Sequence, residues 1–91
     1  MWKKRCVSLY VEWVNEENIS SVIRLLERIG ADLAGIDEDI DLENYPSPEI
    51  KRNHTVLRIR INRKMPSFVL LTELIHLPEV ASVSEMHSGI P

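Results

Sequence analysis

Two segments of this chain alternate apolar and polar residues with a period of two, and they limit its fold more than any other feature. They span residues 6–14 and residues 54–62. Because successive side chains of a strand point to opposite faces, each segment is predicted to be a β-strand with one buried face. The side chains predicted to be buried are Val7, Leu9, Val11 and Trp13 in the first strand and Leu57, Ile59 and Ile61 in the second.

Two other segments repeat apolar residues every three or four positions, which is typical of amphipathic helices. The first predicted helix is capped by Asn15 or Asn18 and ends before Gly30, where a left-handed C-terminal cap belongs. The second begins near Pro66 or Ser67. The predicted stripes are Ile19, Val22, Ile23, Leu26 and Ile29 in the first helix, and Phe68, Leu71, Leu74 and Ile75 in the second; Ser20, Ser21, Arg24, Glu27 and Arg28 are expected to face water.

A third strand is predicted in residues 31–42. Ile36, Ile40 and Leu42 are evenly spaced there, which favours one apolar face. Gly35 lies inside this segment and indicates a β-bulge.

A fourth, short strand is predicted in residues 80–86, with Val83 pointing inward. Residues 43–53 hold two prolines and many polar side chains, so a loop is expected there. The tail at residues 87–91 is expected to be frayed.

The predicted order is strand, helix, strand, strand, helix, strand. This order predicts an α+β fold, the ferredoxin-like β-α-β-β-α-β sandwich, with a four-stranded antiparallel sheet and two helices on one face. A chain of 91 residues has room for one core. Residues 1–91 are therefore expected to form a single domain, with its core in about residues 5–86.

This packing leaves one face of the sheet without helices. Tyr10, Glu12, Arg58 and Arg60 are predicted to lie on that face, with Glu12 paired to Arg58 or Arg60 across the sheet. Two interpretations remain open. Either the face is solvated and carries scattered ion pairs, or it meets a partner or a second copy, since Arg and Tyr are favoured at such contacts.

No metal site, cofactor or catalytic site is predicted. The acidic run at residues 37–43 has the D-x-D-x-D spacing of an EF-hand loop, but Leu42 stands where that loop needs glycine and Pro48 where it needs glutamate. A weak magnesium contact through one or two carboxylates stays open. The histidines are scattered singly, and no serine or cysteine has the sequence signature of an activated nucleophile, so the chain is not expected to be an enzyme.

Charge argues against nucleic acid as a partner. The net charge is −3, whereas phosphate binders carry a basic excess. The single cysteine, Cys6, excludes an internal disulfide within the chain and fits a reducing compartment.

The element order and the ending in residues 77–85, Leu-Pro-Glu-Val-Ala-Ser-Val-Ser-Glu, resemble ACT-like domains, in which L-P-x-V often closes the second helix. Within that group the chain is most similar to the C-terminal cytosolic domain of MgtC/SapB-family membrane proteins. The segments that carry this resemblance are residues 9–13, 18–19, 22–26, 57–64 and 80–85.

The resemblance implies a regulatory or protein-interaction domain of a membrane protein linked to magnesium homeostasis, without implying that the domain binds magnesium. It also implies a location on the cytoplasmic face of a bacterial membrane, reached through an N-terminal transmembrane bundle that this sequence lacks. Lys3, Lys4 and Arg5 would then lie just below the bilayer. A homodimer is expected, in contact with a protein partner or with its own transmembrane domain.

The alternative is an ACT-type domain that senses an amino acid, as part of a metabolic enzyme or an alarmone synthetase. Such domains usually carry a glycine in the turn between the first strand and the first helix. Residues 14–18 contain none, which argues against close backbone approach to a ligand there.

Overall fold

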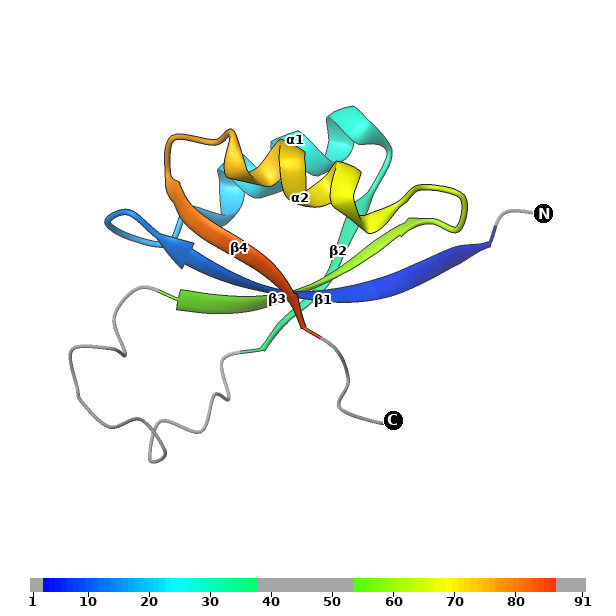
Figure 1. Ribbon diagram of the computed structural model, residues 1–91, viewed down its shortest axis with the longest axis horizontal. Coiled ribbons are helices and arrows are strands. Elements are labelled where there is room, and N and C mark those ends of the chain that lie inside the picture. The colour runs from blue at the N-terminus through cyan, green and yellow to red at the C-terminus, as the bar shows by residue number, and fades with distance from the viewer. Residues whose placement is uncertain (1–2, 38–53, 87–91) are drawn as a thin grey trace.

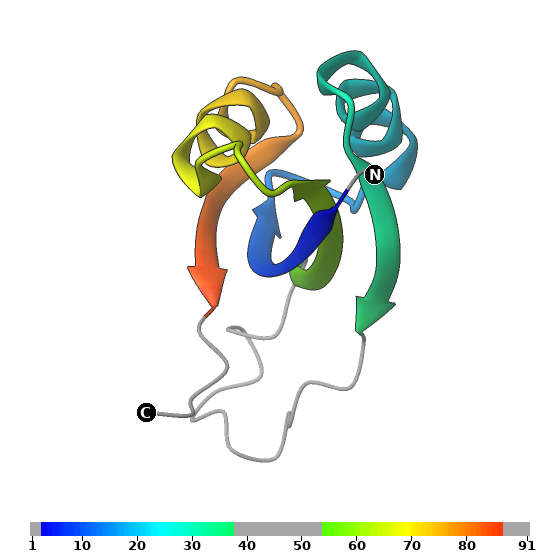
Figure 2. The ribbon, with the colours of Figure 1, turned by 90° about the vertical axis from the view of Figure 1, so that its right-hand side faces the viewer.

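The computed structural model describes residues 3–37 and 54–86 and shows an α+β fold. Its elements are β1 (Lys4–Trp13), α1 (Ile19–Ile29), β2 (Asp32–Asp37), β3 (His54–Asn62), α2 (Ser67–Ile75) and β4 (Val80–Met86). The sheet order is β2-β3-β1-β4, with every neighbouring pair antiparallel. Both helices lie on the same face of the sheet (Figures 1 and 2). The predicted ferredoxin-like arrangement is therefore confirmed.

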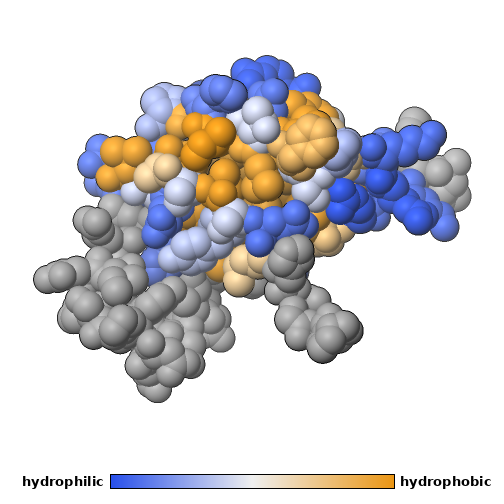
Figure 3. Space-filling model, viewed as in Figure 1, coloured by the Kyte–Doolittle hydropathy of each residue, from blue (hydrophilic) through white to orange (hydrophobic). Residues whose placement is uncertain are grey.

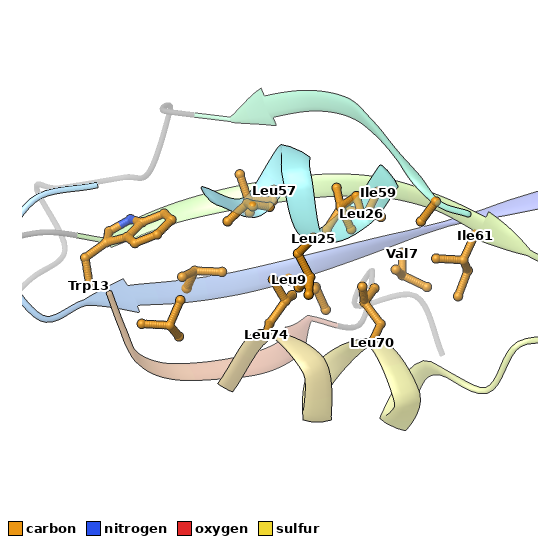
Figure 4. Packing of buried hydrophobic residues seen from close by; sticks show 14 residues of the cluster. Val7, Leu9, Trp13, Leu25, Leu26, Leu57, Ile59, Ile61, Leu70 and Leu74 are labelled. Atoms are coloured by element: carbon orange, nitrogen blue, oxygen red, sulfur yellow. The ribbon is translucent and has the colours of Figure 1, made fainter. Parts of the chain in front are cut away.

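The core lies between the two central strands and the helices. Strand β1 pairs with β3 so that Leu9 is opposite Leu57 and Val7 is opposite Ile59. Leucines from both helices meet over these strands (Figure 4). The buried cluster comprises Val7, Leu9, Val11, Trp13, Val22, Leu25, Leu26, Ala31, Leu57, Ile59, Ile61, Leu70, Leu74 and Val80.

One polar contact is built into this core. The indole Nε1 of Trp13 donates a hydrogen bond of 2.9 Å to Oγ1 of Thr55, and both residues are buried. A buried indole N–H needs an acceptor, since an unpaired buried donor costs free energy. Thr55 supplies it from the neighbouring central strand.

The ends of α1 follow the sequence prediction. The Oδ1 atom of Asn18 accepts a hydrogen bond of 3.2 Å from the backbone N–H of Ser21, which makes Asn18 the N-cap. Gly30 ends the helix in the left-handed region, with φ of 78°. Next to it, the N–H of Ala31 donates to the carbonyl of Leu26 at 2.8 Å.

The predicted apolar stripe of α1 needs two corrections. Ile23 is 39% exposed, whereas Leu25 is 2% exposed and belongs to the core. Ser21, predicted to face water, is buried because its hydroxyl points to Glu79 and donates to it at 3.3 Å.

The predicted stripe of α2 is wrong at two of its four positions. Phe68 is 66% exposed and Ile75 is 43% exposed, whereas Leu70 and Leu74 are fully buried. Apolar residues occur on most sides of this short helix, so their spacing does not define a single face. The side facing the sheet is that of Leu70 and Leu74.

The edge strands agree with the prediction as far as they are described. The register of β2 against β3 shifts between Leu33 and Gly35, which confirms the predicted bulge next to Gly35, with Ala34 as the extra residue. Val83 of β4 is half-buried and lies opposite Val11, on the helix side. The predicted strand positions after Asp37, the loop 43–53 and the tail 87–91 lie outside the described residues. Neither helix in the described part of the chain is long and apolar enough to cross a bilayer.

The corrected stripe of α2 predicts a sharp contrast between two single substitutions. Leu70→Ala should lower the free energy of unfolding by about 2–5 kcal/mol, because it opens a cavity in the core. Thr72→Ala, on the exposed side of the same helix, should change it by no more than about 0.5 kcal/mol. Urea unfolding followed by circular dichroism measures both, and equal effects would contradict the assigned face.

Candidate functional site

The four residues predicted to form an interaction face all lie on the helix-free face of the sheet. Val7, Leu9 and Val11 point toward the helices, so Tyr10 and Glu12 of β1 point the other way. The same alternation on β3 places Arg58 and Arg60 on the helix-free face. The structure does not gather the four at one point, because Glu12 lies opposite His54 and Arg60 lies opposite Cys6.

The predicted pairing of Glu12 with an arginine is wrong. The Oε1 atom of Glu12 accepts a hydrogen bond of 2.6 Å from the hydroxyl of Ser82 on β4. Arg58 is opposite Ser8, four residues along β1 from Glu12, which is about 13 Å in an extended strand. The antiparallel register therefore separates the charges that the sequence pattern had placed together.

Arg60 instead forms an ion pair with Asp32 of β2. Its Nη2 atom lies 3.0 Å from Oδ2 of Asp32, and its Nε atom lies 3.4 Å from Oδ1. The Nζ atom of Lys4 lies 3.5 Å from the same carboxylate. Hydrogen bonding and the positive charge of Arg60 hold the pKa of Asp32 below its usual value. The three side chains are nearly half exposed, so salt screens this cluster.

Arg58 occupies space that a glycine provides. It lies opposite Gly35 across the β2–β3 pair, and its guanidinium fills the position that a Cβ atom at residue 35 would take. Gly35 therefore serves two purposes, since it also follows the bulge. The sequence indicated the bulge, but it did not indicate that Gly35 leaves space for the side chain of Arg58.

An aromatic pair completes the helix-free face. The rings of Tyr10 and His54 are stacked, with centroids 5.4 Å apart and planes at 28°. Val56, directly opposite Tyr10 and two residues from His54 along β3, is only 6% exposed. This end of the face thus combines the aromatic pair and Val56 with the carboxylate of Glu12, while the end near Arg60 carries the Asp32–Arg60 ion pair.

Two exposed large apolar residues, Phe68 and Ile75, lie elsewhere, on α2, and Leu71 beside them is half-buried against the core. Glu73 of α2 faces α1, where its Oε1 atom is 3.9 Å from Nη2 of Arg28. Phe68, Leu71 and Ile75 lie on the other side of α2, away from α1 and next to the edge strand β4. We call these three residues the α2 flank. Figure 3 shows apolar side chains gathered over this side of the molecule.

The α2 flank was missed at the sequence level, because Phe68 and Ile75 were placed in the core. One feature of the sequence did indicate an exposed apolar surface on α2. A helix whose apolar residues spread well beyond one stripe has more apolar surface than a single core contact covers. Large exposed apolar patches mark contact surfaces in soluble proteins.

A second feature is an open cleft at the N-terminal end of α1. It has a volume of about 710 Å³ and is lined by Asn15, Glu16, Glu17, Asn18 and Glu79. One carboxylate oxygen of Glu79, Oε2, accepts the hydrogen bond from Ser21. The other, Oε1, is buried and has no hydrogen-bond partner. Sequence analysis did not single out Glu79.

Within residues 3–37 and 54–86, no three His, Cys, Asp or Glu side chains are grouped so that they could hold a metal ion. Most of the acidic run at residues 37–43 lies outside this part of the chain. Comparison with known protein families, with curated proteins and with solved structures finds no match. The resemblance to MgtC/SapB-type domains stays a prediction from sequence.

The ion pair predicts a measurable change in acid titration. In Arg60→Gln, the pKa of Asp32 should rise toward its ordinary value of 3.8, because the main hydrogen bond to the carboxylate is lost. A depressed pKa in the folded state stabilises the protein above the unfolded-state pKa, and this gain disappears as the pH falls through the folded value. The advantage of the native protein over Arg60→Gln should therefore be full near neutral pH and vanish in acid. Carboxyl NMR titration and unfolding from pH 2 to 7 measure both effects, and an unchanged Asp32 pKa would contradict the pairing.

Proposed function

We propose that this chain is a regulatory domain that works through protein–protein contact, as part of a membrane protein of the MgtC/SapB type. The observation that carries the contact is the α2 flank. Phe68 is 66% exposed although Leu70 and Leu74 of the same helix already fill the core. Leu71 of the flank packs partly against the core, whereas the exposed surfaces of Phe68 and Ile75 are available to another surface.

Burial of the α2 flank by a partner has a substantial driving force. A phenylalanine side chain buries about 150–250 Å² when fully covered, and apolar area contributes roughly 25 cal/mol per Å². Aromatic anchors near the centre of a contact commonly dominate its binding energy. Phe68 is the large aromatic side chain available for this role on α2.

The membrane part of the proposal rests on the sequence resemblance and on the basic N-terminal cluster. Lys3 and Lys4 are exposed at the start of β1. Arg5 is half-buried and donates to the carbonyl of Met65 at 2.7 Å, so it contributes to the fold instead. Lys4 already lies 3.5 Å from the carboxylate of Asp32, so Lys3 is the basic side chain of this cluster most available to a membrane surface, where a basic residue contributes about 1 kcal/mol.

The proposal predicts different effects for two charge substitutions in the full-length gene product. Phe68→Glu should impair growth of the bacterium in low magnesium, because a carboxylate on the α2 flank opposes burial. Ile23→Glu is the matched control, since Ile23 is also exposed but lies on α1. It should grow like the native strain at equal protein level. Equal growth of both variants, or a reading frame without transmembrane segments upstream, would contradict the proposal.

One observation favours a second candidate function, amino-acid sensing at the cleft beside α1. The unpartnered Oε1 atom of Glu79 is a suitable acceptor for an ammonium group, and the cleft is large enough for an amino acid. The turn at residues 14–18 lacks the glycine common in such domains. This second candidate therefore rests on Glu79 alone.

Thermal denaturation in the presence of each of the twenty amino acids tests this candidate. A ligand that binds the folded state raises the melting temperature, and a concentration one hundred times the Kd adds about 2.7 kcal/mol of stability. Glu79→Gln should abolish the shift, whereas Glu16→Gln, in the same cleft but exposed, should reduce it only partly. No shift with any amino acid at millimolar concentration would exclude this function.

A further inference from the structure

We infer that one end of the domain, which carries the exposed side chains of Lys3, Arg63 and Lys64, lies against an anionic lipid bilayer. We call these three residues the basic end. The inference deepens the proposed function and rests on it, since it names the surface through which the domain meets its membrane. The ligand is the layer of negatively charged lipid head groups, and no apolar group has to enter the bilayer.

The charges of the described residues are divided between the two ends of the molecule. Residues 3–37 and 54–86 contain nine basic and nine acidic side chains, so this part of the chain has no net charge. At the opposite end from the basic end, Glu16, Glu17 and Glu79 line one cleft. Figure 3 shows hydrophilic side chains gathered where β1 begins. Six of the nine basic side chains lie at the start of β1, the end of β3 and the turn after it: Lys3, Lys4, Arg5, Arg60, Arg63 and Lys64.

Backbone hydrogen bonds hold the basic end together. The N–H of Arg63 donates to the carbonyl of Lys3 at 3.3 Å, which places the start of β1 beside the turn that follows β3. Within this turn, the N–H of Met65 donates to the carbonyl of Asn62 at 2.9 Å, and the N–H of Lys64 donates to Oδ1 of Asn62 at 2.9 Å. An ordered backbone therefore presents the three charges, and only side-chain freedom is lost when they meet a surface.

Neighbouring carboxylates do not neutralise the basic end. Lys4 and Arg60, next to it, both lie against Asp32. Among residues 3–37 and 54–86, by contrast, the side chains of the basic end form no ion pair. At physiological ionic strength opposite charges attract over a screening length of about 8 Å. These hydrated side chains are thus attracted to a negative surface without being buried.

The acidic end does not oppose this attraction. Strand β1 joins the two ends and has ten residues, which extend about 33 Å at roughly 3.3 Å per residue. This distance is several times the screening length of about 8 Å, so a surface that touches the basic end acts only weakly on Glu16 and Glu17. The division of charge therefore selects one orientation, with the acidic end pointing away from the surface.

Shape and location favour lipid over nucleic acid. Proteins that bind single-stranded nucleic acids hold the strand in a groove whose basic side chains follow the backbone. The basic end is instead the start of a strand beside a turn, at one extreme of the long axis (Figure 1), and such a tip suits a plane. In the proposed membrane protein the transmembrane part precedes Lys3, which holds the basic end near the head groups. Tethering makes even a weak contact effective, because it raises the local concentration.

Co-sedimentation with lipid vesicles at low salt tests the inference. The native chain should bind vesicles of equal parts phosphatidylglycerol and phosphatidylcholine about 100-fold more strongly than vesicles of phosphatidylcholine alone, since each of three basic side chains contributes about fivefold. Lys64→Glu should lower this binding about 25-fold, because it removes one attraction and adds one repulsion.

Arg24→Glu is the matched control for Lys64→Glu. It makes the same change of charge, but Arg24 lies on α1 and lines a hollow together with Glu79, at the acidic end. It should bind the mixed vesicles like the native chain. Circular dichroism verifies that both variants fold. Equal binding of the native chain to the two kinds of vesicle, or equal losses in the two folded variants, overturns the inference.

NMR of the native chain tests the orientation without any substitution. Mixed vesicles that carry a gadolinium ion on a lipid head group broaden the amide signals of residues close to the bilayer. The signals of Arg63 and Lys64 should broaden, whereas those of Glu16 and Glu17 should not. Uniform broadening, or stronger broadening at the two glutamates, contradicts the assigned orientation.

Two further comparisons separate this inference from its rivals. A single-stranded oligonucleotide that binds the native chain more tightly than the mixed vesicles do overturns the inference in favour of nucleic acid. The growth assay with Phe68→Glu decides the protein contact independently. Vesicle binding by the basic end together with normal growth of Phe68→Glu overturns the proposed function alone. Impaired growth of Phe68→Glu without any lipid preference of the native chain overturns the inference alone.

Discussion

One-sided burial of the sheet governs the rest of this structure. Leu9, Leu57 and Ile59 of the two central strands are fully buried beneath both helices, whereas the alternate positions of the same strands face away. This arrangement requires the helices to supply all the cover on one side, which they do chiefly with paired leucines. The residues on the other face of the sheet, on its two edges and on the outer sides of the helices are therefore not needed to fill this core.

Those remaining surfaces differ in chemistry. The helix-free face combines the Asp32–Arg60 pair at one end with the Tyr10–His54 stack at the other. The side formed by α2 and β4 is instead apolar, with Phe68 as its most exposed large side chain. Water solvates charged side chains that are nearly half exposed, so they need no partner. Exposed apolar side chains instead lower the free energy of the protein when another surface covers them. This contrast is why α2, and not the arginine-bearing face, carries the proposed protein contact.

The sequence predicted the fold well because the two central strands alternate in polarity over most of their length and α1 has clear end signals. From Val7 to Trp13 and from Leu57 to Ile61 each change of face coincides with a change of polarity, and Asn18 and Gly30 mark the ends of α1 by their capping chemistry. The ion pair of Glu12 was mispredicted for a different reason. Sharing a face fixes only the direction of a side chain, whereas pairing depends on the register between strands, and no local pattern in β1 or β3 encodes that register.

The error in α2 has the same physical origin as the proposed contact. Periodicity identifies a buried face only when the other faces are polar, and α2 has apolar residues both toward the sheet and toward solvent. Leu70 and Leu74 are the apolar residues of α2 that pack against the sheet, and α1 lies on the side of Glu73. The exposed apolar residues left over are Phe68 and Ile75, while Leu71 is half-buried against the core. A helix with two apolar sides is stabilised fully only when both are covered, so the surface that sequence analysis misassigned is the one that a partner is expected to bury.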